Sequence, residues 1–470
     1  MKRFLWLFFL GISFYATSQQ MVLKKGMVTD SIPVANNSTE NFAVYLPKAY
    51  DSSQEWPVVF VCDMHGQGIN ALKNYGTSAE QLGYILVSIN NLADTLSISQ
   101  NVMIANKTIN GTASLFSIDP ARIYATGFAE GARFASILPV FIDKMEGIIS
   151  CGSDIGNTEV LNAKKPFHYI GIVGKGDFSY PNILQSTKIL DKLKFPNQLI
   201  TFDGRHEWPP ADKFRNALEI FTLSSMAKGN IAKDTVFIRE EYNRNWYGIN
   251  AAISAQKLLE AEELLTRATS IFRLLVPVDS LNDKYRWVKK NKVYKTQKRD
   301  ENTAFNKESF TREDYIYFLE DDVNTYNLEN LGWWNYQMGE LKKYASSPNR
   351  IDRQLGERLN GFINALIEEN IDALKKEDPV DEEGLRFLWM LKTITSPMEY
   401  PYYLQIISNS AKIEDFGTAL FYTEELLKKG YTDKKELYNL KDTALLRITP
   451  EFNELVAKYL KEARYDLPIE

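Results

Sequence analysis

Three short segments of the chain contain residue types that could carry out chemistry. In the first, Gly127 and Gly131 are spaced four residues apart and Ala129 lies midway between them. The second ends in a carboxylate, Asp177, and the third contains a histidine, His206. A histidine that takes a proton from a nucleophile or from water is the commonest general base in enzymes, and a carboxylate often orients it. These segments are therefore the first candidates for a site.

The segment Asp119–Gly131 resembles the nucleophile elbow of α/β-hydrolases, most closely that of the esterases that include polyhydroxybutyrate depolymerases and feruloyl esterases. In that family the motif Gly-x-Ser-x-Gly forms a strained turn between a strand and a helix. Gly127 and Gly131 match its glycines, with a strand pattern before them and a helical pattern after them. Ala129 stands where the family has its nucleophilic serine, and a methyl group cannot attack a carbonyl.

The resemblance extends to two later motifs, in the family's chain order. Asp177, in Gly-Lys-Gly-Asp after a strand, matches the triad acid. His206, in Asp-Gly-Arg-His-Glu-Trp-Pro, matches the catalytic base. Arg205 stands where the family pattern has a glycine. This loop is therefore expected to differ in shape from the family's loop. The resemblance covers about 180 residues and implies a Ser-Asp-His triad whose nucleophile is degenerate.

An oxyanion hole is also implied by the resemblance. His65-Gly66-Gln67-Gly68 follows a predicted strand and matches the loop that donates one backbone N–H in the family. The candidate donors are therefore the N–H groups of Gly66 and Gln67, together with that of Glu130, the residue after the elbow position.

Each of these residues also has an alternative interpretation. Asp177 and His206 could be relics whose hydrogen bond still ties two loops together. Glu130 could act as a replacement nucleophile, because carboxylates form covalent intermediates, although its place one residue past the elbow tip argues against this role. His65 fits loop packing better than a general base, and His168, just before an apolar strand, reads as a structural histidine.

The chain has only two cysteines, Cys62 and Cys151. They end two strands that flank the elbow strand from opposite sides in the family's strand order. Two strand spacings separate them by roughly 10 Å, whereas a disulfide needs Cα atoms within about 7 Å. We therefore expect both cysteines to be buried and reduced.

The first half of the chain alternates between strand and helix patterns. Alternation of this kind predicts an α/β fold with a mostly parallel sheet and helices on both faces. Helical patterns include Gly131–Asp143 and Ser186–Leu193. The predicted strands are Phe42–Leu46, Val58–Cys62, Ile85–Asn90, Ile123–Gly127, Gly147–Cys151, Tyr169–Val173 and Gln198–Phe202.

The second half is predicted to be all helical. Apolar residues recur at helical spacing in Ser254–Leu274, Leu355–Leu374 and Glu383–Ile394. The pair Tyr402–Lys412 and Phe416–Lys429 resembles a tetratricopeptide unit, although no regular 34-residue period runs through the preceding residues. Trp333 and Trp334 fit a core better than a sugar platform. The polar segment Asn282–Arg312 is predicted to be a solvated connector, with a binding face as the alternative.

Four regions follow from these patterns. Residues 1–18 read as a signal peptide, because a charged start precedes an apolar run of about a dozen residues and a small-residue cleavage site. An N-terminal segment (19–40), an α/β-hydrolase-like domain (41–228) and a helical domain (229–470) follow. The mature protein is expected to be exported to the periplasm or beyond the cell, without a transmembrane segment.

Composition excludes several function classes. The chain has 470 residues, with 55 basic and 60 acidic side chains and a net charge of −5, which argues against a nucleic-acid partner. Two cysteines and three histidines leave little material for a metal centre, and we expect no metal or cofactor.

Two functions remain from the sequence. The favoured one is a non-catalytic binding or scaffold module, with the helical domain as a surface for a protein or peptide and the vestigial cleft as a site for an ester or carbohydrate. The alternative is an esterase acting on carbohydrate esters or polyesters through an unconventional nucleophile or activated water. A third reading is a carrier of small ligands. Whether the protein is an enzyme stays open.

Overall fold

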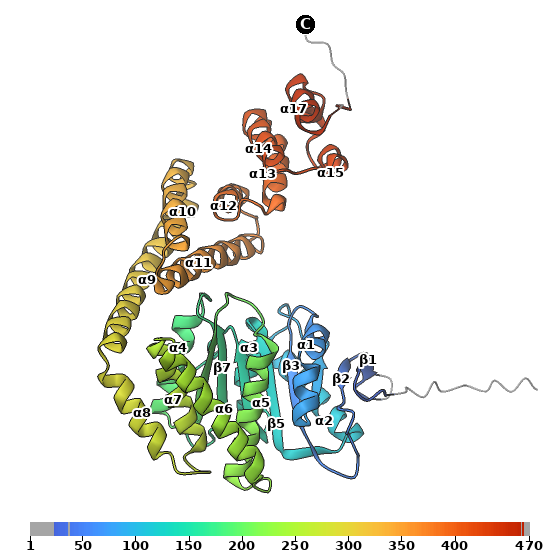
Figure 1. Cartoon of the computed structure of the whole chain (residues 1–470). Coiled ribbons are helices and arrows are strands. Elements are labelled where there is room, and N and C mark those ends of the chain that lie inside the picture. Colours follow the sequence, from blue (N-terminus) through green and yellow to red (C-terminus); the bar gives the residue numbers. More distant parts are fainter. Residues whose placement is uncertain (1–22, 36–37, 462, 465–470) are drawn as a thin grey trace, which may run out of the picture.

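The structure is a computed structural model that describes residues 23–35, 38–461 and 463–464. The predicted signal peptide lies outside the described residues. An α/β part is followed by a helical part that extends away from it (Figure 1). The strands are β1 (Val28–Pro33), β2 (Asn41–Tyr45), β3 (Trp56–Cys62), β4 (Ile85–Ile89), β5 (Ile118–Phe128), β6 (Met145–Cys151), β7 (His168–Gly174) and β8 (Asn197–Phe202).

The helices of the α/β part are α1 (Gly68–Leu82), α2 (Ile98–Leu115), α3 (Glu130–Phe141), α4 (Tyr180–Lys192) and α5 (Ala211–Lys228). Those that follow are α6 (Thr235–Ser254), α7 (Leu258–Phe272), α8 (Asp279–Lys290), α9 (Lys292–Thr325), α10 (Leu331–Ala345), α11 (Arg350–Leu374), α12 (Glu382–Thr395), α13 (Tyr400–Lys412), α14 (Phe416–Lys428), α15 (Lys434–Asn439), α16 (Ala444–Arg447) and α17 (Pro450–Leu460), with a short 3₁₀ turn at Leu328–Asn330.

The strands form one mixed sheet in the order β1-β2-β4-β3-β5-β6-β7-β8. β1 and β2 pair antiparallel at one edge, and the strands from β4 to β8 pair parallel. All seven predicted strands are present in the sheet. Their short apolar runs made them recognisable, since such runs are typical of strands covered on both faces. β1 was not predicted, since its sequence Val-Thr-Asp-Ser-Ile-Pro is half exposed and has no such run.

Helices cover both faces of the sheet, as predicted. α1 and α5 pack on one face, where Tyr75 and Phe214 stack in a core with β3, β4 and β7. α2, α3 and α4 contribute to the core of the other face. In a parallel sheet the carboxyl ends of the strands meet at one edge, so the loops after β3, β5, β7 and β8 share that edge. The candidate site residues lie in these loops, except Glu130, which is the first residue of α3.

The helices after Lys228 begin beside the sheet. α7 packs against α5 and β8, and α6 packs against α7. Glu263 on α7 accepts a hydrogen bond from Thr201 of β8 at 2.7 Å. The predicted domain division at 228/229 stays a prediction, and α6 and α7 physically extend the layer that α5 begins.

The predicted connector Asn282–Arg312 is wrong. These residues belong to α8 and to α9, a continuous helix of 34 residues. Its buried side chains, which include Tyr294, Ala304 and Glu308, are widely spaced along a charged sequence. Because charged and polar residues dominate the composition of this segment, the few buried positions at helical spacing were not recognised, and the segment was predicted to be a solvated connector.

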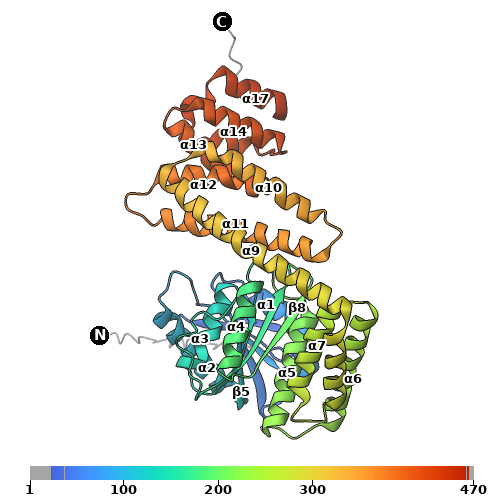
Figure 2. The same cartoon turned by 90° about the vertical axis from the view of Figure 1, so that its left-hand side faces the viewer.

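Helices α10 to α17 form the far end of the molecule (Figure 2). Trp334 is fully buried and donates from its indole N–H to Asp322 at 2.7 Å, so the core interpretation is confirmed for this residue. α13 and α14 pack together as the predicted helix pair, whereas the tetratricopeptide likeness stays a prediction. Among the described helices, none has the length and apolar character needed to cross a membrane.

Candidate functional site

The turn between β5 and α3, where the sequence predicts the elbow, has a strained backbone at Ala129. Ala129 has φ 48° and ψ −120°, a conformation that side-chain-bearing residues rarely adopt. Its N–H donates to the carbonyl of Cys151 at 3.1 Å. A Cβ on Gly127 would overlap the backbone of Gly131, and a Cβ on Gly131 would overlap the carbonyl of Cys62. The two motif glycines are therefore required by close backbone packing.

Asp177 and His206 come together as the sequence predicted. Asp177 follows β7 and its side chain is 1% exposed, while His206 lies in the loop after β8 and is 29% exposed. His206 Nδ1 lies 3.1 Å from each carboxylate oxygen of Asp177. Asp177 also accepts a hydrogen bond from the backbone N–H of Ser179 at 2.8 Å. A buried carboxylate placed in this way fixes the orientation of the imidazole, as an orienting acid does for a general base.

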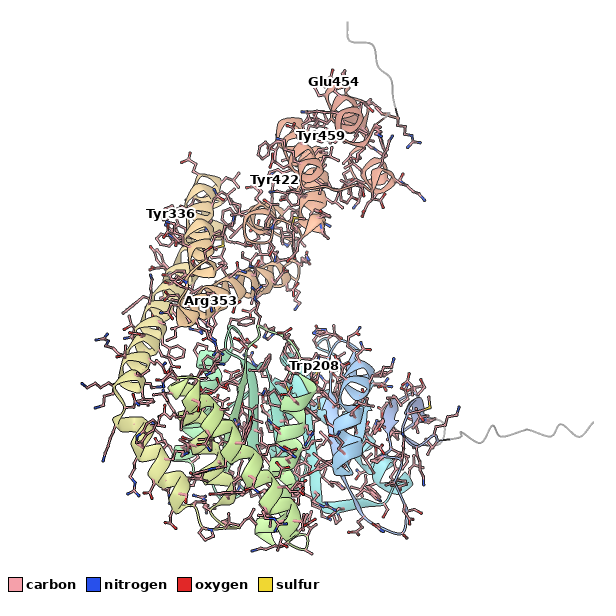
Figure 3. All side chains as sticks on the ribbon, in the orientation of Figure 1. Trp208, Tyr336, Arg353, Tyr422, Glu454 and Tyr459 are labelled. Atoms are coloured by element: carbon pink, nitrogen blue, oxygen red, sulfur yellow. The ribbon has the colours of Figure 1, made fainter. Side chains whose placement is uncertain are left out.

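Aromatic rings connect His206 with the elbow. The ring centroid of His206 lies 4.7 Å from that of Phe128, the residue before Ala129, and 4.5 Å from that of Phe178. Phe128 also contacts Trp208 at 5.5 Å between centroids. Figure 3 shows Trp208 at the edge of the α/β part that faces the helical part. The structure therefore brings the elbow, the acid and the histidine into one cluster.

The predicted oxyanion loop lies beside the same cluster. Gly66 has φ +71° and Gln67 precedes the first residue of α1. His65 Nε2 lies 3.7 Å from a carboxylate oxygen of Glu130, and both side chains are mostly exposed. His65 is therefore a surface residue, and the expectation of loop packing is wrong for its side chain. The loop Asp63–Gly68 and the start of α3 face one another, which is the arrangement that two N–H donors need.

No replacement nucleophile is evident in this cluster among the described residues. Burial raises the pKa of both Cys62 and Cys151, that of Cys151 to about 12, so neither thiol offers a thiolate near neutral pH. Both cysteines are free and buried, which confirms the predicted reduced state. The Glu130 carboxylate is turned to His65.

The helical part contacts the loop that carries Asp177. Arg358 on α11 donates from Nη1 to the carbonyl of Lys175 at 2.8 Å, and Arg312 on α9 donates from Nη2 to the carbonyl of Phe178 at 2.7 Å. These two carbonyls lie on either side of Asp177 in the chain. Two arginines from distant helices therefore hold the acid loop by its backbone.

One carboxylate joins the two arginines. Glu308 on α9 forms ion pairs with Arg312 at 2.6 Å and with Arg358 at 2.7 Å. The side chains of Glu308 and Arg358 are only 2% and 4% exposed. We call Glu308, Arg312 and Arg358 the arginine clamp. Because buried charges are costly unless they are paired and hydrogen-bonded, the clamp requires all of its partners.

Arg205 makes a second link between the two parts. Where the family pattern has a glycine, this side chain reaches Glu357 on α11, with Nε and Nη2 each 3.1 Å from Oε1. A cavity of about 370 Å³ lies next to this pair, between the His206 loop and helices α10, α11 and α12. Its walls include Phe178, Arg205, His206, Met338, Leu341, Lys342, Glu357, Asn360, Ile394 and Pro397.

Sequence reasoning missed the clamp and this cavity. Arg312 and Arg358 lie in charged helical sequence 134 and 183 residues from the carbonyls that they contact, and no local pattern marks a hydrogen bond to backbone across that separation. The glycine-to-arginine departure at Arg205 was the one available signal. His168 is buried and its Nε2 is hydrogen-bonded to Gln198, while its Nδ1 has no partner among the described residues. The described residues contain no group of three or more potential metal ligands.

The chain is similar to solved structures over about two fifths of its length. No protein-family model and no curated protein matches the chain. Solved structures that are similar include a feruloyl esterase module from Clostridium thermocellum (16% identity, 41% of this chain and 86% of that one, TM-score 0.32). A second is an S-formylglutathione hydrolase from Staphylococcus aureus (12% identity, 43% of this chain and 99% of that one, TM-score 0.34). A third is an acetyl ester-xyloside bifunctional hydrolase from Caldicellulosiruptor lactoaceticus (17% identity, 40% of this chain and 89% of that one, TM-score 0.32).

The first part of this chain has an α/β-hydrolase fold. Its own strand order, the strained turn between β5 and α3, and the acid and histidine loops after β7 and β8 define that class. The helix-rich part from α6 onward follows it in the sequence.

Proposed function

We propose that this protein is an exported, catalytically disarmed α/β-hydrolase-like protein that acts as a binding or scaffold module, with its helical part as the surface for a protein or peptide partner. One observation carries the proposal: Ala129 occupies the tip of an elbow whose backbone, acid and histidine are otherwise in place. A hydrolase that lacks a triad member retains only the residual catalysis of its oxyanion hole and of substrate binding.

The contacts from the helical part support a binding role. The cavity beside His206 has apolar walls from Phe178, Met338 and Leu341, and its volume lies near the lower end of the range for small-molecule sites. An ester or a carbohydrate that enters this cavity would contact both parts of the chain. Binding there would therefore be sensed by α10, α11 and α12 without any bond being broken.

The alternative function is an esterase that activates water. The pairing of His206 with Asp177 favours it, because an oriented imidazole can take a proton from water while N–H groups near Gly66 and Glu130 stabilise the oxyanion. In that case the protein would hydrolyse esters slowly without a covalent intermediate.

Hydrolysis of a short-chain p-nitrophenyl ester by the purified protein separates the two functions. Wild type is compared with His206→Ala and with Ala129→Ser, which restores the hydroxyl on an unchanged backbone. We expect wild type and His206→Ala to give the same background rate, and Ala129→Ser to exceed both.

The opposite result has an equally definite meaning. If wild type hydrolyses the ester and His206→Ala does not, water activation is the function and the binding proposal fails. The double variant Ala129→Ser/His206→Ala serves as a control, because a rate gain that survives the loss of His206 would not come from a rebuilt triad.

A further inference from the structure

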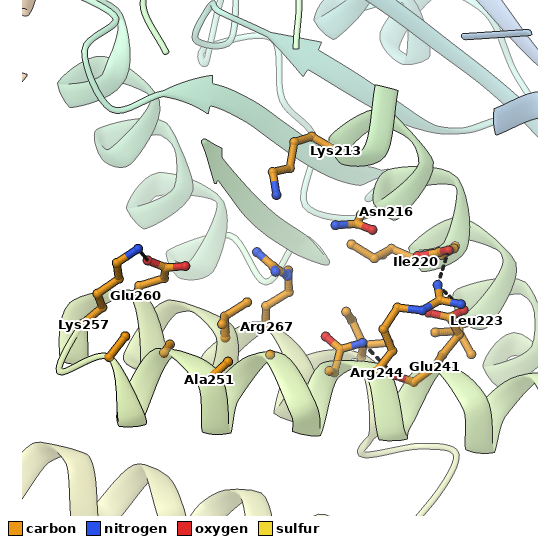
Figure 4. Close-up of a pocket in the computed structure, with 17 residues that line it drawn as sticks. Lys213, Asn216, Ile220, Leu223, Glu241, Arg244, Ala251, Lys257, Glu260 and Arg267 are labelled. Atoms are coloured by element: carbon orange, nitrogen blue, oxygen red, sulfur yellow. Dashed lines mark hydrogen bonds and ion pairs between the residues drawn. The ribbon is translucent and has the colours of Figure 1, made fainter. Parts of the chain in front are cut away.

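A second cavity lies between α5, α6 and α7, and it shares no lining residue with the cavity beside His206. Its volume is about 450 Å³, which falls in the range of small-molecule sites. Figure 4 shows it as an elongated space above one face of α6, with α5 as the opposite wall. Nothing in the proposed function uses this cavity.

Two cations face one another across it. Lys213 on α5 and Arg267 on α7 turn their charged ends toward the same space (Figure 4). Within the described part of the chain, the Arg267 guanidinium has one hydrogen bond, to the carbonyl of Leu199 at 3.1 Å. Among the residues that the structure describes, Lys213 pairs only with the mostly exposed Asp212. Like charges that point at one another repel, and an anion between them would remove the repulsion.

Nearby carboxylates do not supply that anion. Burial lowers the pKa of Arg267, and the charges of Glu263 and Glu260 oppose this effect without pairing with it directly. Glu263 is held by Lys175 at 2.6 Å and by Thr201. Glu260 lies 3.8 Å from Lys257 and 4.0 Å from Arg350. The guanidinium is thus left with most of its donors for another acceptor.

The acidic end of the cavity is neutralised from within. Arg244 pairs with Glu219 at 2.6 Å and with Glu241 at 2.8 Å, and Arg215 pairs with Glu219 at 2.8 Å. Burial, followed by the charge of Glu219, raises the pKa of Glu241 to about 7. Among the described lining residues, Lys213 and Arg267 are therefore the cations without a carboxylate partner inside the cavity, since the partner of Lys213 is the exposed Asp212.

The floor of the cavity is a row of small residues on α6. Gly248, Ala251 and Ala255 recur at helical spacing, and Ile220 and Leu264 add apolar walls. A Cβ built on Gly248 would meet no atom within 4 Å, so no packing inside the chain requires glycine there. Glycine destabilises a helix interior, and here its lack of a side chain leaves the floor of the cavity open at this position.

We propose that this cavity binds a small aliphatic monocarboxylate, with the carboxylate between Lys213 and Arg267 and the alkyl chain along the Gly248–Ala255 face of α6. A planar carboxylate matches the guanidinium fork and takes the remaining positive charge from Lys213. Burial of the alkyl chain against the apolar walls of the cavity removes apolar surface from water and so favours binding.

Isothermal titration of the whole mature chain with octanoate tests the site, with octanol and inorganic phosphate as comparison ligands. We expect saturable octanoate binding that Lys213→Met and Gly248→Leu each weaken at least about tenfold. The leucine side chain at position 248 would occupy the cavity without a clash at its Cβ and without a change of charge. Gly339→Leu is the matched control, because this glycine of α10 also has no atom near its Cβ position, and it should bind octanoate as wild type does.

Three outcomes would overturn the proposal. The first is the absence of saturable octanoate binding. The second is equal binding by the Gly248→Leu and wild-type proteins, which would place the ligand elsewhere. The third is equal affinity for octanol or for inorganic phosphate, since either would remove one half of the recognised chemistry.

Discussion

The elbow and the acid loop of the candidate site are held in different ways. At the elbow the backbone is fixed from within, because Gly127 and Gly131 pack against neighbouring main chain. At the acid loop the side chains persist, and α9 and α11 hold the backbone from outside through the arginine clamp. The difference teaches that two loops at one edge of a sheet can keep their shape for two independent physical reasons.

The largest expected effect comes from the clamp. Replacement of Glu308 by Gln leaves Arg312 and Arg358 buried without their shared anion, which we expect to lower the free energy of unfolding by about 3–5 kcal/mol. Urea unfolding followed by tryptophan fluorescence measures it. Glu357→Gln is the matched control, because it breaks a more exposed ion pair to Arg205 and should cost at most about 1 kcal/mol. Equal losses in both variants would show that the clamp does not hold the loop.

The stability of the protein also depends on pH through His168, which belongs to neither the elbow nor the acid loop. Burial lowers the pKa of His168, at the start of β7, to about 4, against about 6.5 in the unfolded chain. The unfolded state therefore binds the proton first, and stability is full above pH ~6.5 and lost as the pH falls toward 4. At pH 5 the loss is about 2 kcal/mol.

Urea unfolding at pH 7 and pH 5 checks the His168 effect. We expect His168→Gln to have a smaller loss between these pH values than wild type. Ala129→Gly, which changes no titratable group, should keep the wild-type loss. An unchanged loss in His168→Gln would show that another group is the source of the acid sensitivity.

The smallest effect concerns the elbow and has the opposite sign. Because Ala129 adopts a positive φ that glycine tolerates better, Ala129→Gly should raise the free energy of unfolding by about 1 kcal/mol. Ala135→Gly, in the interior of α3, is expected to lower it by a similar amount or more. A destabilised Ala129→Gly protein would mean that the turn is not strained, and the contrast between the two regions would weaken.

The sequence predicted local features well and the links between the two halves poorly. Apolar runs marked the strands, and the spacing of Gly127 and Gly131 placed the elbow between β5 and α3. Asp177 and His206 were paired on the strength of their motifs. α9 was missed because its buried positions are sparse among charged residues, and the clamp because Glu308 contacts residues that only the tertiary fold brings near.

The length of α9 has a mechanical consequence. A helix of 34 residues extends about 50 Å, and this one runs from the layer beside the sheet to the base of the far helices (Figure 2). Glu308 and Arg312 lie partway along it, where Arg312 donates to the acid loop and Glu308 pairs with Arg312. Because α9 and α11 both donate hydrogen bonds to the backbone beside Asp177, a displacement of either helix would act on this loop directly.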